Sequence, residues 1–161
     1  MGGLYCLHVN IIREERRKVQ GVDILESPGF LVNKLAHAMA VDLDRQLQAH
    51  GVTTSQWAIL ALLWRREGRS QVELQEILGV EAATITGLAR RMEQLGLVRR
   101  EADPRDKRVQ RVALTARGRA LEGVLVPVAD AVNARALDGF SSDERHFFVR
   151  LLLRALHNYD G

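Results

Sequence analysis

The fold of this protein is indicated most clearly by residues 70–115, which read SQVELQEILGVEAATITGLARRMEQLGLVRREADPRDKRVQRVALT. Ser70 and Glu73 form a capping box, in which each side chain satisfies a backbone N–H of the other residue at the start of a helix, and Gly79 ends this short helix. A second helix is predicted over about 81–95, because apolar residues recur there with a helical period. Two short helices joined by a tight turn are typical of a helix-turn-helix.

A basic β-hairpin is predicted directly after these helices. Residues 97–100 and 109–114 read as two short strands that flank the turn-rich segment 103–106, DPRD. The basic residues of the hairpin are Arg99, Arg100, Arg105, Lys107, Arg108 and Arg111. The whole pattern is that of a winged helix-turn-helix, in which the second helix enters the major groove of DNA.

Further helices are predicted on both sides of this stretch. Ser27 and Pro28 begin a helix that extends to about residue 50, and Thr53 begins the next helix with another capping box. After the hairpin, Thr115 caps a long helix in which Pro127 predicts a kink or a local break. A last helix follows a third capping box at residues 141–144. The fold class is therefore mainly α, a winged helix-turn-helix with a two-stranded wing and a helical dimerisation region.

The expected organisation is an N-terminal arm, residues 1–27, followed by a single domain, residues 28–161. Within this domain we expect the DNA-binding lobe over about 53–115 and dimerisation helices over about 28–50 and 116–160. A homodimer is expected because the apolar stripes of the flanking helices have no other partner in the sequence to cover them.

The basic excess of the chain is confined to its middle third. The 161 residues have a formal net charge of +3; residues 1–64 carry six positive and six negative charges, residues 65–117 twelve and eight, and residues 118–161 five and six. A local excess indicates a phosphate-binding surface, although a solvated charged face gives the same count. Neither a signal peptide nor an apolar run of roughly 18 residues is present. We therefore expect a cytoplasmic protein that does not bind a membrane.

The segments LGLVRR at 95–100, DPRDKR at 103–108 and VALT at 112–115, within this order of helices, resemble the MarR family of winged helix-turn-helix regulators. The resemblance covers roughly residues 28–159. It implies a transcription regulator of the repressor type that binds a palindromic site in double-stranded DNA as a homodimer. It also implies that a small molecule, such as an aromatic or phenolic effector, or an oxidant releases the DNA.

The candidate site residues follow from this combined interpretation. The predicted DNA-binding residues are Ser70, Thr84, Thr86, Arg90, Arg91, Arg105, Lys107 and Arg108. Arg105 at the hairpin tip suits the minor groove, whose negative potential attracts arginine. Asp103 and Asp106 are expected to pair with neighbouring arginines and support the wing, because phosphate repels carboxylates. The resemblance further suggests Met39 and Trp57 as lining residues of an effector site, and it leaves base contact at Gly87 in doubt, since many members carry a longer polar side chain there.

Several other functions are weighed against this one. Cys6 is the single cysteine, and a redox-sensing regulator that uses its thiol is one alternative. A winged-helix module that binds protein and not DNA is another. The sequence offers no motif for a catalytic nucleophile, paired catalytic carboxylates or a phosphate loop, so no enzyme is expected. The five histidines are not spaced as metal ligands, and neither a metal nor another cofactor is expected.

Overall fold

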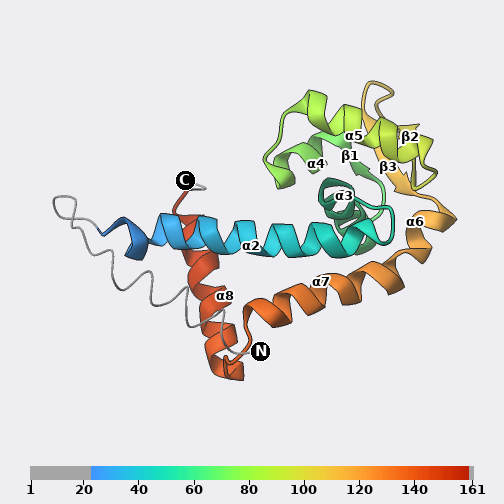
Figure 1. Ribbon diagram of the computed structural model, residues 1–161. Coiled ribbons are helices and arrows are strands. Elements are labelled where there is room, and N and C mark those ends of the chain that lie inside the picture. The colour runs from blue at the N-terminus through green and yellow to red at the C-terminus, as the bar shows by residue number, and fades with distance from the viewer. Residues whose placement is uncertain (1–22, 160–161) are drawn as a thin grey trace. The chain divides into compact units, whose positions relative to one another are not determined.

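A computed structural model describes residues 23–159 of the chain. The chain divides into two compact units, residues 1–41 and residues 42–161. The elements in chain order are η1 (Ile24–Glu26), α2 (Pro28–Gln48), α3 (Thr54–Arg65), β1 (Arg69–Ser70), α4 (Gln71–Leu78), α5 (Ala82–Gln94), β2 (Val98–Ala102), β3 (Gln110–Leu114), α6 (Ala116–Ala120), α7 (Glu122–Ala136) and α8 (Ser142–His157) (Figure 1). The mainly helical fold class predicted from the sequence is confirmed.

The first unit contains the 3-10 helix η1 and most of α2. The hydroxyl of Ser27 accepts a hydrogen bond from the backbone N–H of Phe30 at 3.3 Å, and α2 begins at Pro28. This start agrees with the predicted cap and with proline at the first helical position. The helix continues across the boundary into the second unit, where Leu47 near its end is buried.

The capping boxes define the helices of the second unit as the sequence predicts. Ser70 Oγ accepts from the N–H of Glu73 at 3.1 Å, and the Glu73 carboxylate accepts from the N–H of Ser70 at 2.7 Å. Gly79 ends α4 in the left-handed conformation, with φ of 63°, which glycine adopts without steric cost. Helices α4 and α5 lie side by side in Figure 1, joined by this tight turn.

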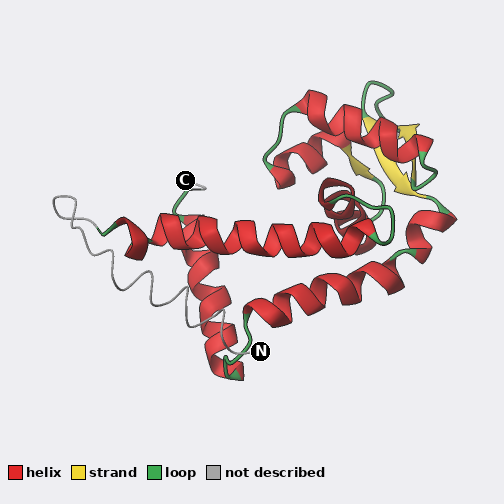
Figure 2. Cartoon of the chain, viewed as in Figure 1, coloured by secondary structure: helices red, strands yellow, loops and turns green. Residues whose placement is uncertain are grey.

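The wing is a hairpin of two strands, as predicted, and a third strand extends its sheet. Strand β3 pairs antiparallel with β2 along one edge, where Val98 lies opposite Leu114, and with β1 along the other, where Arg69 lies opposite Val112 (Figure 2). The predicted two-stranded sheet is thus extended by β1. Strand β1 has only two residues, which is too short a segment to show the alternation typical of a strand. Only its pairing with β3 identifies it as a strand.

The core of the second unit is formed by α3, α4, α5 and the sheet, together with the end of α2 and part of α7. Its fully buried large side chains are Leu47, Ile59, Leu60, Leu63, Leu74, Ile85, Met92, Val98, Val112, Leu114 and Leu125. The apolar face of α5 contributes to this core, so the opposite face of the same helix is turned to solvent.

The long helix predicted after the wing is interrupted, but not at Pro127. Helix α6 ends before Leu121, α7 begins immediately after it, and Pro127 lies inside α7. A local break at Pro127 is therefore wrong, and the alternative, a kink at this residue, stays a prediction. Gly118 and Gly123 flank the interruption, and glycine lowers helix stability by about 1 kcal/mol relative to alanine. This explains a weak point in the helix near Leu121.

Helix α8 begins at the third capping box, where Ser141 Oγ accepts from the N–H of Glu144 at 3.3 Å. None of its residues is buried, although it carries large apolar side chains. Within residues 23–159, no helix combines the length and the hydropathy that crossing a membrane requires.

Candidate nucleic-acid interface

The polar face of α5 presents the predicted contact residues to solvent. Thr84, Thr86, Arg90 and Arg91 are all exposed, and they follow the first turns of the helix toward its end. The buried residues of the same helix fix this face outward, because they occupy the opposite side. Short hydroxyl groups and long guanidinium groups on one exposed helix face can reach base edges and phosphates.

One of these residues, Thr86, makes a side-chain hydrogen bond within the protein. The Thr86 hydroxyl donates to the side-chain oxygen of Gln71, the first residue of α4, at 3.1 Å. A side chain built at Gly87 would place its Cβ 3.5 Å from a terminal nitrogen of Arg91. This is an ordinary van der Waals distance, so a side chain at position 87 would lie against the Arg91 guanidinium without displacing it.

The wing loop is organised around Asp103, whose side chain is buried. One carboxylate oxygen accepts from the backbone N–H groups of Arg105 at 2.7 Å and Asp106 at 3.2 Å, and the other accepts from the Arg111 guanidinium. The backbone N–H of Arg105 and the Arg111 side chain together lower the pKa of Asp103, since both stabilise its charged form. Asp103 thus holds the bend of the loop through backbone contacts.

Asp106 is paired with one arginine of the same loop. Its two oxygens accept from Nε and a terminal nitrogen of Arg108, each at 3.0 Å, and one of them also accepts from the Arg108 backbone N–H. The Arg108 side chain lowers the pKa of Asp106, and the pKa of Arg108 is raised in return. This bidentate pair occupies the Arg108 guanidinium within the loop.

Other basic residues of the wing connect it to the rest of the lobe. Arg111 donates to the backbone carbonyl of Gly68 at 2.6 Å, which ties β3 to the connection between α3 and α4. Arg100 donates to Glu93 at the end of α5 through its backbone at 2.9 Å and through Nε at 2.8 Å. The side chain of Arg100 lowers the pKa of Glu93. These contacts fix the wing relative to α5.

Arg105 and Lys107 differ from the other four basic residues of the hairpin. Both are exposed, and within the described part of the chain neither side chain has an ion-pair or hydrogen-bond partner. Arg99, by contrast, pairs with Glu101 and donates to the carbonyl of Leu114 at 3.0 Å. The cations available to an external anion at the wing tip are therefore Arg105 and Lys107.

Ser70 holds a structural position in this lobe. It is 7% exposed, and its hydroxyl caps α4 by accepting from the N–H of Glu73. Its contact with phosphate stays a prediction.

The two predicted effector residues lie in different units, Met39 on α2 in the first and Trp57 on α3 in the second. Trp57 is half-buried, and its indole nitrogen is buried without a hydrogen-bond partner among residues 23–159. An unpaired buried donor is costly and suits an acceptor group on a ligand. Cys6, the predicted redox residue, lies outside the described residues.

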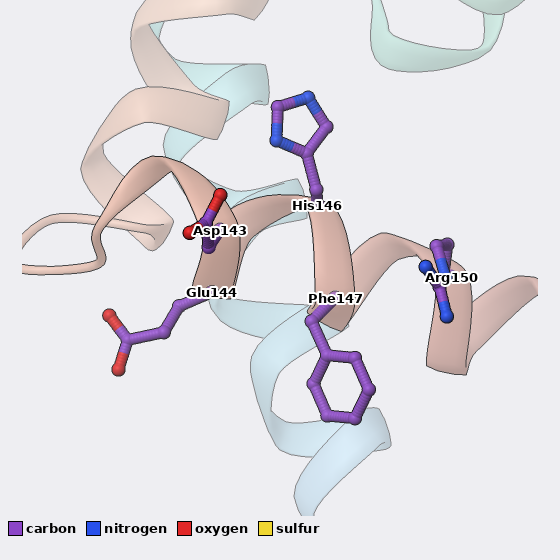
Figure 3. Close-up of a pocket in the computed structure, with 5 residues that line it drawn as sticks. All are labelled: Asp143, Glu144, His146, Phe147 and Arg150. Atoms are coloured by element: carbon purple, nitrogen blue, oxygen red, sulfur yellow. The ribbon is translucent and has the colours of Figure 1, made fainter.

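A shallow hollow lies on the surface of α8 and is lined by Asp143, Glu144, His146, Phe147 and Arg150 (Figure 3). All five side chains come from this one helix and point in different directions around it, so the hollow has a single wall. Small-molecule sites usually enclose most of their ligand. We therefore do not assign an effector site to this hollow.

Comparison with known proteins gives a consistent result. The model of the MarR family matches residues 52–109. The transcriptional regulator HosA of Escherichia coli O111:H- is 35% identical over 106 residues, which cover 66% of this chain and 78% of HosA. The transcriptional activatory protein BadR of Rhodopseudomonas palustris is 36% identical over 133 residues, 80% of this chain and 76% of BadR.

Among solved structures, BpsR of Bordetella bronchiseptica superposes with a TM-score of 0.72 at 26% identity, covering 79% of this chain and 96% of that one. The solved structure of BpsR concerns the mechanism by which 6-hydroxynicotinic acid regulates the DNA binding of BpsR.

Proposed function

The chain belongs to the MarR family of transcriptional regulators, and we propose that it acts in the cytoplasm as a homodimer on a palindromic DNA operator. In this proposal α5 enters the major groove and the wing between β2 and β3 reaches the adjacent minor groove. The observation that carries it is the exposed polar face of α5 beside a wing whose tip displays Arg105 and Lys107, two cations without an ion-pair partner among residues 23–159.

The DNA-binding lobe of the proposal comprises about 53–115, with about 28–50 and 116–160 as dimerisation helices. The proposed contacts are Ser70, Thr84, Thr86, Arg90, Arg91, Arg105, Lys107 and Arg108, with Asp103 and Asp106 supporting the wing. The internal pairing of Arg108 assigns it a smaller share of the binding than Arg105, because its guanidinium must leave Asp106 before it can contact phosphate.

The dimer is supported by apolar side chains that the described chain leaves uncovered in the second unit. The exposed large apolar residues from α7 to residue 159, just after α8, are Val124, Val126, Phe140, Phe147, Val149, Leu151, Leu153, Leu156 and Tyr159. A helix that buries none of its apolar residues within its own chain gains stability by packing against another copy. Closed two-fold pairing is the commonest way to cover such a surface.

Replacing Leu153, which is 60% exposed, with glutamate tests the dimer. We expect the unchanged protein to scatter light as twice 18.1 kDa, and Leu153→Glu to raise the dimer dissociation constant at least about tenfold, because a carboxylate would be desolvated in the interface. Arg154→Ala, at the next position of the same helix, is the control. A monomeric unchanged protein, or equal dissociation constants for it and the Leu153→Glu variant, would contradict the proposal.

We further propose that the regulator is a repressor that a small aromatic or phenolic effector releases from DNA, with Met39 and Trp57 among the residues near the effector. One support is the buried indole N–H of Trp57, which has no hydrogen-bond partner in the described part of the chain and would donate to a phenolate or carboxylate oxygen. The other is the regulation of BpsR by 6-hydroxynicotinic acid. The carboxylate and ring hydroxyl of that compound illustrate the chemistry expected of such an effector.

Selection of DNA from a random pool tests the function directly. We expect a two-fold symmetric sequence whose half-sites lie about 10 base pairs apart, and affinity that falls steeply as salt rises. Hydroxylated aromatic acids added to the complex should then release the DNA. If the protein selects no sequence and its DNA binding does not depend on salt, it is a winged-helix module for protein partners.

A further inference from the structure

The contact between α4 and α5 places a glutamine behind a residue of the proposed DNA-reading face. Gln71 is the first residue of α4, and its side-chain oxygen accepts the hydrogen of the Thr86 hydroxyl at 3.1 Å. Thr86 is exposed on α5, and an oxygen that donates its hydrogen to Gln71 keeps its two lone pairs for a partner outside the protein. The contact therefore orients a hydroxyl group that would otherwise rotate freely.

The amide of Gln71 makes this contact at a cost. Its nitrogen is buried and has no hydrogen-bond partner among residues 23–159. A buried donor without a partner is destabilising and calls for a functional explanation. The oxygen of the same amide provides a functional explanation, because it accepts the hydrogen bond from the Thr86 hydroxyl.

The orientation of the hydroxyl decides which base edges it can recognise. A threonine hydroxyl has one hydrogen and two acceptor lone pairs, and here the hydrogen is directed at Gln71. The atom presented to DNA is then an acceptor only. In the major groove, adenine and cytosine offer amino hydrogens, whereas guanine and thymine offer only acceptor atoms.

We propose that Gln71 is a positioning residue that sets the base preference of Thr86, so that adenine or cytosine is selected over guanine or thymine at the base that Thr86 faces. This inference rests on the proposed function, since it requires α5 in the major groove. It assigns to Gln71 a role in specificity without any contact to DNA.

The experiment measures the affinity of the protein for a set of operators that differ from one another at a single position of the half-site. Each position is tested in turn with each of the four bases. The unchanged protein is compared with Gln71→Met, which keeps the length of the side chain and removes the acceptor, and with Thr86→Val, which keeps the shape and removes the hydroxyl. Gln75→Met is the matched control, because Gln75 lies one turn further along α4 and its side chain makes no hydrogen bond in the described structure. Thermal unfolding of each variant confirms that it is folded.

We expect one position at which the unchanged protein prefers adenine or cytosine about fivefold, the scale of one neutral hydrogen bond. At that position Gln71→Met should bind the guanine and thymine operators about fivefold more tightly, because the released hydroxyl can donate. Thr86→Val should bind the adenine and cytosine operators more weakly, and Gln75→Met should keep the original preference.

Two results would overturn the inference and leave the DNA-binding function intact. The first is that the unchanged protein prefers guanine or thymine at the position where Thr86→Val changes the preference. The second is that Gln71→Met keeps the base preference of the unchanged protein; if it also loses affinity equally for all four operators, Gln71 has only a structural role. If the unchanged protein binds no operator at all, the proposed function itself fails.

Discussion

Gly118→Ala is expected to destabilise the protein by about 3 kcal/mol, the upper range for forcing extra atoms into a packed site. A Cβ at position 118 would overlap the carbonyl oxygen of Leu97 and lie 3.1 Å from its carbonyl carbon and 3.2 Å from a side-chain carbon of Leu114. Backbone atoms cannot move aside as a flexible side chain can. Helix α6 would have to separate from the start of the wing.

The same junction carries two further contacts that such a separation would weaken. The indole N–H of Trp64 donates to the carbonyl of Gly118 at 3.0 Å, and the Thr115 hydroxyl donates to the carbonyl of Gly96 at 2.6 Å. The free energy of unfolding of small proteins is about 5–15 kcal/mol, so the loss is a large fraction of the total. Urea denaturation at a fixed protein concentration measures it as a lower midpoint.

Gly123→Ala is the matched control for this substitution. Gly123 lies in α7, and a Cβ there would meet no atom within 4 Å. We expect this variant to be as stable as the unchanged protein or more stable by up to about 1 kcal/mol, because alanine favours the helix. Equal denaturation midpoints for the two variants would show that α6 does not pack against Leu97 as described.

Local signals in the sequence predicted most of the secondary structure. The capping boxes at Ser70 and Ser141 each depend on residues three apart, and both helices begin where these pairs predict. The strands of the wing follow from a change of period within one short segment. These features need no knowledge of distant parts of the chain, which is why the sequence alone indicates them.

Features that depend on contacts between distant segments could not be predicted in this way. Strand β1 is defined by its pairing with β3, and the need for glycine at position 118 arises from the backbone of Leu97. The sequence singles out Arg105 at the hairpin tip but does not show which arginine pairs with which aspartate, whereas the structure pairs Arg111 with Asp103 and leaves Arg105 without a partner in the described chain. Which cations can bind DNA is therefore a question of tertiary structure.

Arg105→Ala is expected to weaken operator binding by about 1 kcal/mol for each wing, and thus by about 2 kcal/mol, or roughly 30-fold, for a dimer with two wings. The shape of the loop should survive, since Asp103 contacts the backbone N–H of Arg105 and not its side chain. The stability of the protein should therefore stay the same. Titration of the selected operator at fixed salt measures the affinity.

Two further variants separate a specific groove contact from a general loss of charge. Lys107→Ala removes one positive charge from the same exposed loop, and Arg105→Lys keeps the charge at the tip but replaces the planar guanidinium. If Arg105 occupies a narrow minor groove, both variants should bind more tightly than Arg105→Ala, and only the two substitutions of Arg105 should reduce the preference for A·T-rich flanking sequence. Equal losses for Arg105→Ala and Lys107→Ala, with unchanged preference for the flanks, would mean that the wing contributes only nonspecific attraction to phosphate.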